Sequence, residues 1–139
     1  MNWKELVLFL GLQLLAIAIA GLAFSNIESR LVAGAVAGGY FVLSGLFMVL
    51  RTIRYNGKWK LLYWYPLLVH VFLISIPMVV IRFLNAGSHF SEVRIWGMEG
   101  PAFHQLSMIV FCILIGATVL DIARAWWSMS IRSKKASAR

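Results

Sequence analysis

Apolar residues along this chain gather into four long blocks, separated by shorter polar segments. The blocks cover 6–24, 31–50, 61–81 and 103–123. Each one is long enough to cross about 30 Å of hydrocarbon as a helix that rises about 1.5 Å per residue. The pattern therefore predicts an all-α integral membrane protein with four transmembrane helices, which form a single domain over residues 1–139.

The composition agrees with a membrane protein. Hydrophobic residues make up 61% of the chain and charged residues 13%, against about half and about a quarter in soluble domains. Cys112 is the only cysteine, which excludes an internal disulfide and a paired-cysteine metal or redox motif. No catalytic triad, phosphate-binding loop or metalloprotease helix is present, so the sequence favours a protein that is not an enzyme.

Basic residues predict the direction of the helices. They concentrate in the segment 51–60 and in the tail 124–139, and the formal net charge is +8. Basic flanks stay in the cytoplasm, so we expect both termini inside, in a bacterial inner membrane, and no nucleic acid partner. The last part of the tail, 131–139, is expected to be a solvated, disordered end rather than a specific site for anionic lipid.

Aromatic residues cluster where the cytoplasmic headgroups are expected, as in the interfacial belts of membrane proteins. They are Trp3, Tyr55, Trp59, Tyr63, Trp64, Tyr65, Trp126 and Trp127.

Small residues predict where helices pack closely. Gly34 and Gly38 in the second block, and Ala16 and Ala20 in the first, stand four positions apart, a spacing that lets two backbones approach. We expect the first two helices to form an antiparallel hairpin. Packing within the chain is favoured over a homodimer face.

His70 is the most informative single residue, because an ionisable group near the middle of a span usually faces protein or a cavity. Pro66 and Pro77 lie on the same side of the predicted helix and free the carbonyls of Leu62 and Leu73. The prolines and the histidine are expected to kink the helix and open a small polar cavity.

Three functional roles suit His70: a haem ligand, a hydrogen-bond partner of a quinone, or part of a proton path. A bis-histidine haem would need a second deep histidine, and the sequence has none. The alternative is a structural hydrogen bond to Gln13 or Ser44, which we favour slightly. Asp121 is expected to form a structural ion pair with Arg124, three positions later on one helix face.

The segment 85–100 is long for a connection between neighbouring helices, and such loops are often functional or folded. It predicts a short amphipathic segment over 88–96 at the outer interface. If this segment is helical, a divalent metal could be held at the outer face by His89, Glu92, Glu99 and His104. Salt bridges of Glu92 and Glu99 with Arg82 and Arg94 are the favoured alternative.

Three functions fit these features. The first is a subunit or homo-oligomer of a membrane complex, whose partners are the lipid bilayer and other membrane chains or copies of itself. The second is a redox-linked subunit with haem or quinone at His70. The third is a transporter for a small solute or metal, or a holin-like pore. The sequence favours the first, because it requires no catalytic motif.

Overall fold

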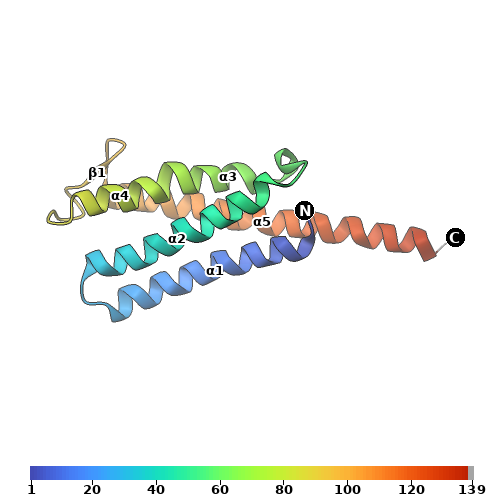
Figure 1. Cartoon of the computed structure of the whole chain (residues 1–139), viewed down its shortest axis with the longest axis horizontal. Coiled ribbons are helices and arrows are strands. Elements are labelled where there is room, and N and C mark those ends of the chain that lie inside the picture. The colour runs from blue at the N-terminus through green and yellow to red at the C-terminus, as the bar shows by residue number, and fades with distance from the viewer. Residues whose placement is uncertain (138–139) are drawn as a thin grey trace.

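The computed structural model describes residues 1–137, with side chains up to Ile131. Four helices in it are long and apolar enough to cross a membrane, as expected of an integral membrane protein. They run Trp3–Asn26, Arg30–Ile53, Trp64–Leu84 and Gly100–Ile131, the last of these within a longer helix. The helices lie side by side as a bundle, and both ends of the chain lie toward the same end of it (Figure 1).

The first two helices, α1 (Trp3–Asn26) and α2 (Arg30–Ile53), extend past the predicted apolar blocks at both ends. Polar residues start them: the side chain of Asn2 accepts a hydrogen bond from the Lys4 N–H, and that of Ser29 accepts one from Val32. Such caps satisfy N–H groups of the first turn that have no partner within the helix. The helix ends therefore follow the capping residues rather than the edges of the apolar runs.

The third span consists of three consecutive helical segments. These are α3 (Trp64–Leu68), a π-helix η2 (Val69–Ser75) and α4 (Ile76–Leu84). At the end of η2, the Ile76 N–H bonds to the carbonyl of Val71, five residues earlier. Pro77 follows at once, where its ring would collide with the carbonyl four residues back in a regular α-helix. The wider π turn before Pro77 is consistent with relief of that collision.

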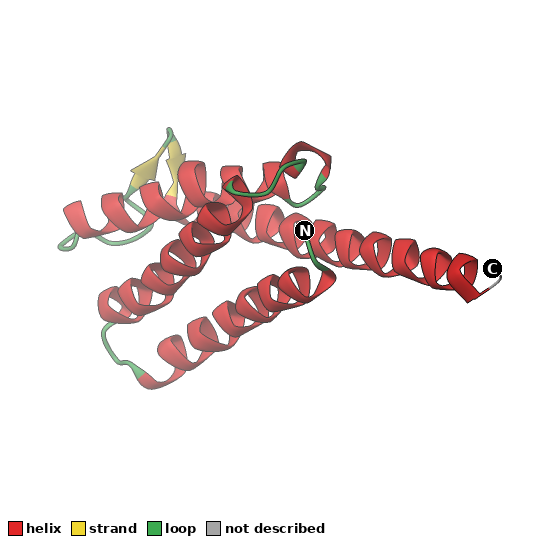
Figure 2. Cartoon of the chain, turned by 45° about the vertical axis from the view of Figure 1, so that its right-hand side comes forward, coloured by secondary structure: helices red, strands yellow, loops and turns green. Residues whose placement is uncertain are grey.

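Glycines of α2 pack against the third span. A Cβ added to Gly38 would lie 2.5 Å from Val79 Cγ2 in α4, and one added to Gly45 would lie 2.5 Å from Val71 Cγ2 in η2. The predicted hairpin of α1 and α2 is present, with the two helices antiparallel and in contact (Figure 2). Gly38, however, faces α4. A Cβ added to Gly34 would lie 4.0 Å from Cζ of the Phe24 ring on α1. Ala16 is buried in the core and Ala20 is half-buried.

The outer loop contains a β-hairpin, and the segment over 88–96, which was predicted to be amphipathic, is not helical. Strand β1 (Arg94–Ile95) pairs antiparallel with β2 (Met98–Glu99), and Ile95 stands opposite Met98. The two turn residues have positive φ, 51° at Trp96 and 81° at Gly97, as a type I′ hairpin turn requires. The hairpin lies along the flank of α4 (Figure 2), with Val93 and Ile95 buried against Ile74 and Phe103.

Two aromatic residues of the predicted belt belong to the core instead. Tyr63 and Trp64 are 0% and 3% exposed, whereas Trp59, in the short 3-10 helix η1 (Lys58–Lys60), is 62% exposed. Trp126 and Trp127 are also exposed. Position at the end of a span therefore does not determine whether these rings face the core or the surface.

The last helix, α5 (Gly100–Ser137), is 38 residues long. Its first part packs in the bundle and its last part projects beyond it (Figure 1). The expectation of a disordered end over 131–139 is therefore wrong up to Ser137. The side chains of Arg132, Lys134 and Lys135, and all of Arg139, lie outside the described part, so the predicted attraction of the tail to anionic lipid has no structural test.

Candidate functional site

His70 lies inside the bundle and is 3% exposed. Its ring stands between Phe41 of α2, at 5.7 Å between ring centroids, and Phe111 of α5, at 4.9 Å. Its Nε2 lies 3.2 Å from the hydroxyl oxygen of Ser75, five residues later in the same span. The π-helix η2 contains both residues, and this helix type often occurs at functional positions.

The other ring nitrogen of His70 is unpaired. Among the described residues, Nδ1 is buried and has no hydrogen-bond partner. The expected bond from His70 to Gln13 or Ser44 is therefore absent, although both residues line the same cavity as His70. An unpaired buried nitrogen carries a free-energy penalty, which makes this atom the most unusual feature of the interior.

Gln13 is the polar group that α1 contributes to the interior. Its side-chain nitrogen donates to the hydroxyl of Thr118 on α5 at 2.9 Å, and that hydroxyl donates to the Leu114 carbonyl at 2.8 Å. Within the described part of the chain, Gln13 Oε1 is buried without a partner, as His70 Nδ1 is. Gln13 and Thr118 are 3% and 0% exposed. Two residues from different helices, each with one unsatisfied buried atom, thus line one cavity.

The cavity itself is small, with a volume of about 10 Å³. It is lined by His70, Gln13, Ser44 and apolar side chains of α1, α2, α3 and α5. The predicted polar cavity at His70 thus exists, but Pro66 and Pro77 do not line it. Its volume is close to what a single water molecule requires and is far smaller than a haem or a quinone ring.

A second polar group ties α5 to the start of α3. The carboxylate of Asp121 accepts the backbone N–H of Tyr63 at 3.1 Å and also that of Leu62. These N–H groups stand at the N-terminus of α3, where a negative charge is favourable. Arg124 lies 3.6 Å from the same carboxylate. Asp121 is therefore a helix cap supplied from another helix, in addition to being the partner of Arg124.

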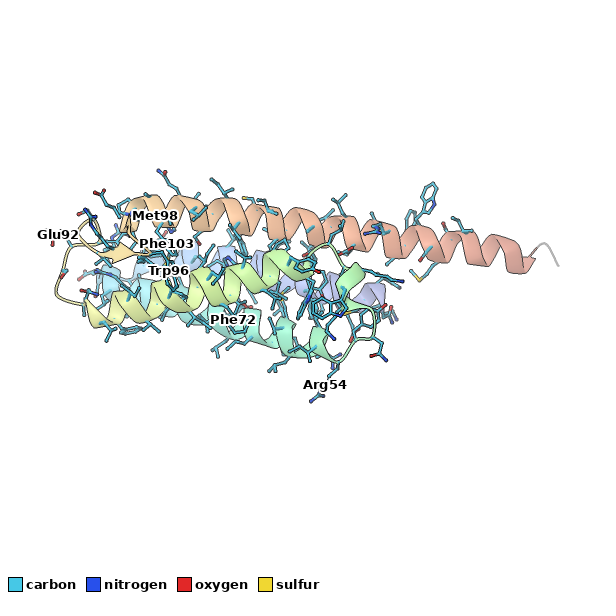
Figure 3. All side chains as sticks on the ribbon, turned by 90° about the horizontal axis from the view of Figure 1, so that it is seen from above. Arg54, Phe72, Glu92, Trp96, Met98 and Phe103 are labelled. Atoms are coloured by element: carbon cyan, nitrogen blue, oxygen red, sulfur yellow. The ribbon has the colours of Figure 1, made fainter. Side chains whose placement is uncertain are left out.

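The four residues proposed for an outer metal site do not gather. His89, Glu92, Glu99 and His104 are all exposed. Among the described residues, no three His, Cys, Asp or Glu side chains form a group that could hold a metal ion. In Figure 3, Glu92 points away from the hairpin at the far end of the loop.

Arg82 does not pair with the loop glutamates. Its guanidinium donates to the carbonyls of Ser88, at 2.8 Å, and Asn85, at 3.4 Å, and lies 5.8 Å from the centre of the Phe90 ring. The expected salt bridges of Arg82 and Arg94 with Glu92 and Glu99 are absent from the described part of the chain, where the ion pairs are Arg51 with Glu5 and Arg124 with Asp121. Arg82 thus holds the loop backbone in place.

Two polar residues of the interior were not predicted from the sequence. Thr118 and Ser75 were not singled out, because a hydroxyl in an apolar helix usually bonds to its own helix backbone. Thr118 does so and also accepts from Gln13, while Ser75 bonds to His70. The available signal was that polar residues are few within the apolar spans, and Gln13, His70, Ser75 and Thr118 are among them.

Comparisons with protein-family models, with curated proteins and with solved structures give no match. The chemistry that can be assigned to this chain comes from its own residues.

Proposed function

We propose that this chain is a non-catalytic membrane subunit that joins a larger assembly, made of copies of itself or of other membrane chains. The supporting observation is the last part of α5, which leaves the bundle (Figure 1) with large apolar side chains uncovered. Trp126 is 64% exposed, Trp127 66% and Ile131 44%. An isolated helical segment of this kind gains little stability without a packing partner.

The length of α5 supports a position of part of this surface outside the lipid. A helix of 38 residues extends about 57 Å at about 1.5 Å per residue, whereas a bilayer with its headgroups is about 40–45 Å thick. If Gly100 lies in the outer headgroup region, next to the polar loop, then Met129 and Ile131 lie at or beyond the opposite surface. Lipid tails cannot cover them there, so another protein chain is the occupant that we propose.

A groove at this end supports the same proposal. It has a volume of about 390 Å³ and is lined by Trp3 at the start of α1 and by Trp126, Met129 and Ser130 of α5. Tryptophan and methionine are enriched in protein interfaces. A helix of a neighbouring chain can lie in this groove against both α1 and α5. In the proposal this end of the bundle faces the cytoplasm of a bacterial inner membrane, as the basic residues predict.

Native mass spectrometry tests the proposal on protein extracted from its own membranes in a mild detergent. We expect a complex of fixed stoichiometry that contains more than one chain. A preparation that contains a single copy with lipid alone contradicts the proposal.

A pair of variants tests whether the groove makes the contact. Trp126→Ala combined with Met129→Ala removes two of its walls, and the complex is expected to dissociate into single chains. Trp59→Ala removes a tryptophan of similar exposure, 62%, outside the groove, and should leave the complex intact. If the double variant retains the same partners with the same stability as Trp59→Ala, the groove is not the interface.

A further inference from the structure

Three polar side chains from three different helices meet at the small cavity in the bundle. They are Gln13 of α1, Ser44 of α2 and His70 of η2. Gln13 and His70 are each 3% exposed, and each has one buried polar atom without a partner in the described interior. The donor or acceptor role of each group follows from its other hydrogen bonds.

Gln13 presents an acceptor to the cavity. Thr118 has a single hydroxyl proton, which it gives to the Leu114 carbonyl at 2.8 Å. Its oxygen must therefore accept from Gln13, 2.9 Å away, so the amide nitrogen of Gln13 points to Thr118. The amide oxygen is then the atom left on the cavity side.

Ser44 also presents an acceptor. Its hydroxyl proton goes to the carbonyl of Tyr40 at 2.7 Å, with Phe41 more distant at 3.4 Å. A hydroxyl whose proton is already used can still accept through its oxygen lone pairs.

His70 supplies the donor. Among the described residues, the hydroxyl of Ser75 lies 3.2 Å from His70 Nε2, and donation to that nitrogen gives the hydroxyl proton an acceptor. A neutral imidazole that accepts at Nε2 carries its own proton at Nδ1. The unpartnered Nδ1 then directs an N–H group toward the cavity.

We infer that the cavity binds one water molecule, which accepts from His70 Nδ1–H and donates to Gln13 Oε1 and Ser44 Oγ. The volume of about 10 Å³ suits one water, and buried waters typically make about three hydrogen bonds. A water molecule can accept one hydrogen bond from His70 and donate its two protons to Gln13 and Ser44. The bound water would link α1, α2 and the third span without a direct side-chain bond. This inference is independent of the proposed function.

Solid-state NMR on protein in lipid bilayers tests the inference. The chain contains three histidines, so ¹⁵N-labelled histidine in the His89→Gln, His104→Gln background reports on His70 alone. Both replaced residues are exposed. We expect ¹⁵N shifts of a neutral ring protonated at Nδ1, and magnetisation transfer from water protons to that ring. A ring protonated at Nε2, or a ring that receives no transfer from water, overturns the inference.

Two matched variants assign the water to this cavity. Gln13→Met keeps the length of the side chain and removes the acceptor, so transfer from water to His70 is expected to fall several-fold. Gln105→Met makes the same change at an exposed position of α5 and should leave the transfer unchanged. Equal transfer in the two variants contradicts a water held by Gln13. The wild-type measurement is decisive by itself if Gln13→Met does not fold.

Discussion

The indole N–H of Trp96 donates a hydrogen bond to the backbone carbonyl of Leu73, 3.0 Å away and 23 positions earlier in the chain. In a regular helix this carbonyl would accept from the residue four positions later, which is Pro77 and has no N–H. Trp96, at the tip of the hairpin, thus supplies to the Leu73 carbonyl the donor that Pro77 lacks. In Figure 3, Trp96 lies beside that span, on the same side as Phe103.

The first prediction concerns this contact. Trp96→Phe keeps an aromatic ring and removes the donor, so the Leu73 carbonyl loses its partner at a cost of about 1–3 kcal/mol. We expect faster amide hydrogen exchange over residues 85–99, measured by mass spectrometry in lipid nanodiscs. Pro77→Ala restores a backbone donor to the helix, so the same Trp96 change should have a smaller effect in that background. Equal effects in both backgrounds would show that Trp96 acts without the freed carbonyl.

The second prediction concerns the close contact of α2 with η2. Gly45→Ala places a methyl group 2.5 Å from Val71 Cγ2, and a valine in a helix has little rotamer freedom to move away. We expect a loss of about 1–3 kcal/mol in the free energy of unfolding, measured by titration with a denaturing detergent. Gly39→Ala is the control, because nothing lies within 4 Å of its added Cβ. A Gly45→Ala protein as stable as the Gly39→Ala protein would contradict the packing described.

The third prediction concerns the cap at the start of α3. Asp121→Ala removes the acceptor for the N–H groups of Leu62 and Tyr63 and should lower the unfolding free energy by about 1–3 kcal/mol. Asp121→Asn keeps one acceptor oxygen and should cost less. Arg124→Gln removes a partner that is 62% exposed, so its effect should stay below about 1 kcal/mol. If Arg124→Gln is as harmful as Asp121→Ala, the ion pair matters more than the cap.

The fourth prediction concerns orientation in the membrane. In a Cys112→Ser background, Ser91→Cys and Asn56→Cys each place one thiol at an exposed position at opposite ends of the bundle. The positive-inside rule predicts that a membrane-impermeant maleimide labels position 91 in intact cells. Position 56 should react only after the membrane is opened. The reverse pattern would invert the proposed orientation.

The candidate site was partly predictable from the sequence. His70 was identified because a histidine is rare in an apolar span, and Leu73 was identified as a carbonyl freed by Pro77. The partners of both were not predicted. His70 bonds to Ser75, which is close in space because η2 is a π-helix, and Leu73 bonds to Trp96 at the tip of a hairpin in a segment that was predicted only to be amphipathic. The hairpin signal was weak, since Trp96 is a bulky residue at a position with φ of 51° that usually favours glycine or asparagine.

The amino-acid sequence by itself determined the four helices that are long and apolar enough to cross a membrane and the place of His70 within the third, because hydrophobicity over about 20 residues is a local property that the bilayer requires. Only the tertiary structure decided which side of each helix faces the core. Tyr63 and Trp64 are buried rather than exposed to the headgroups, and Asp121 caps α3 through the N–H of Tyr63, 58 positions before it. These outcomes depend on contacts between residues far apart in the chain, and in lipid such contacts follow from close packing and polar pairing rather than from hydrophobicity.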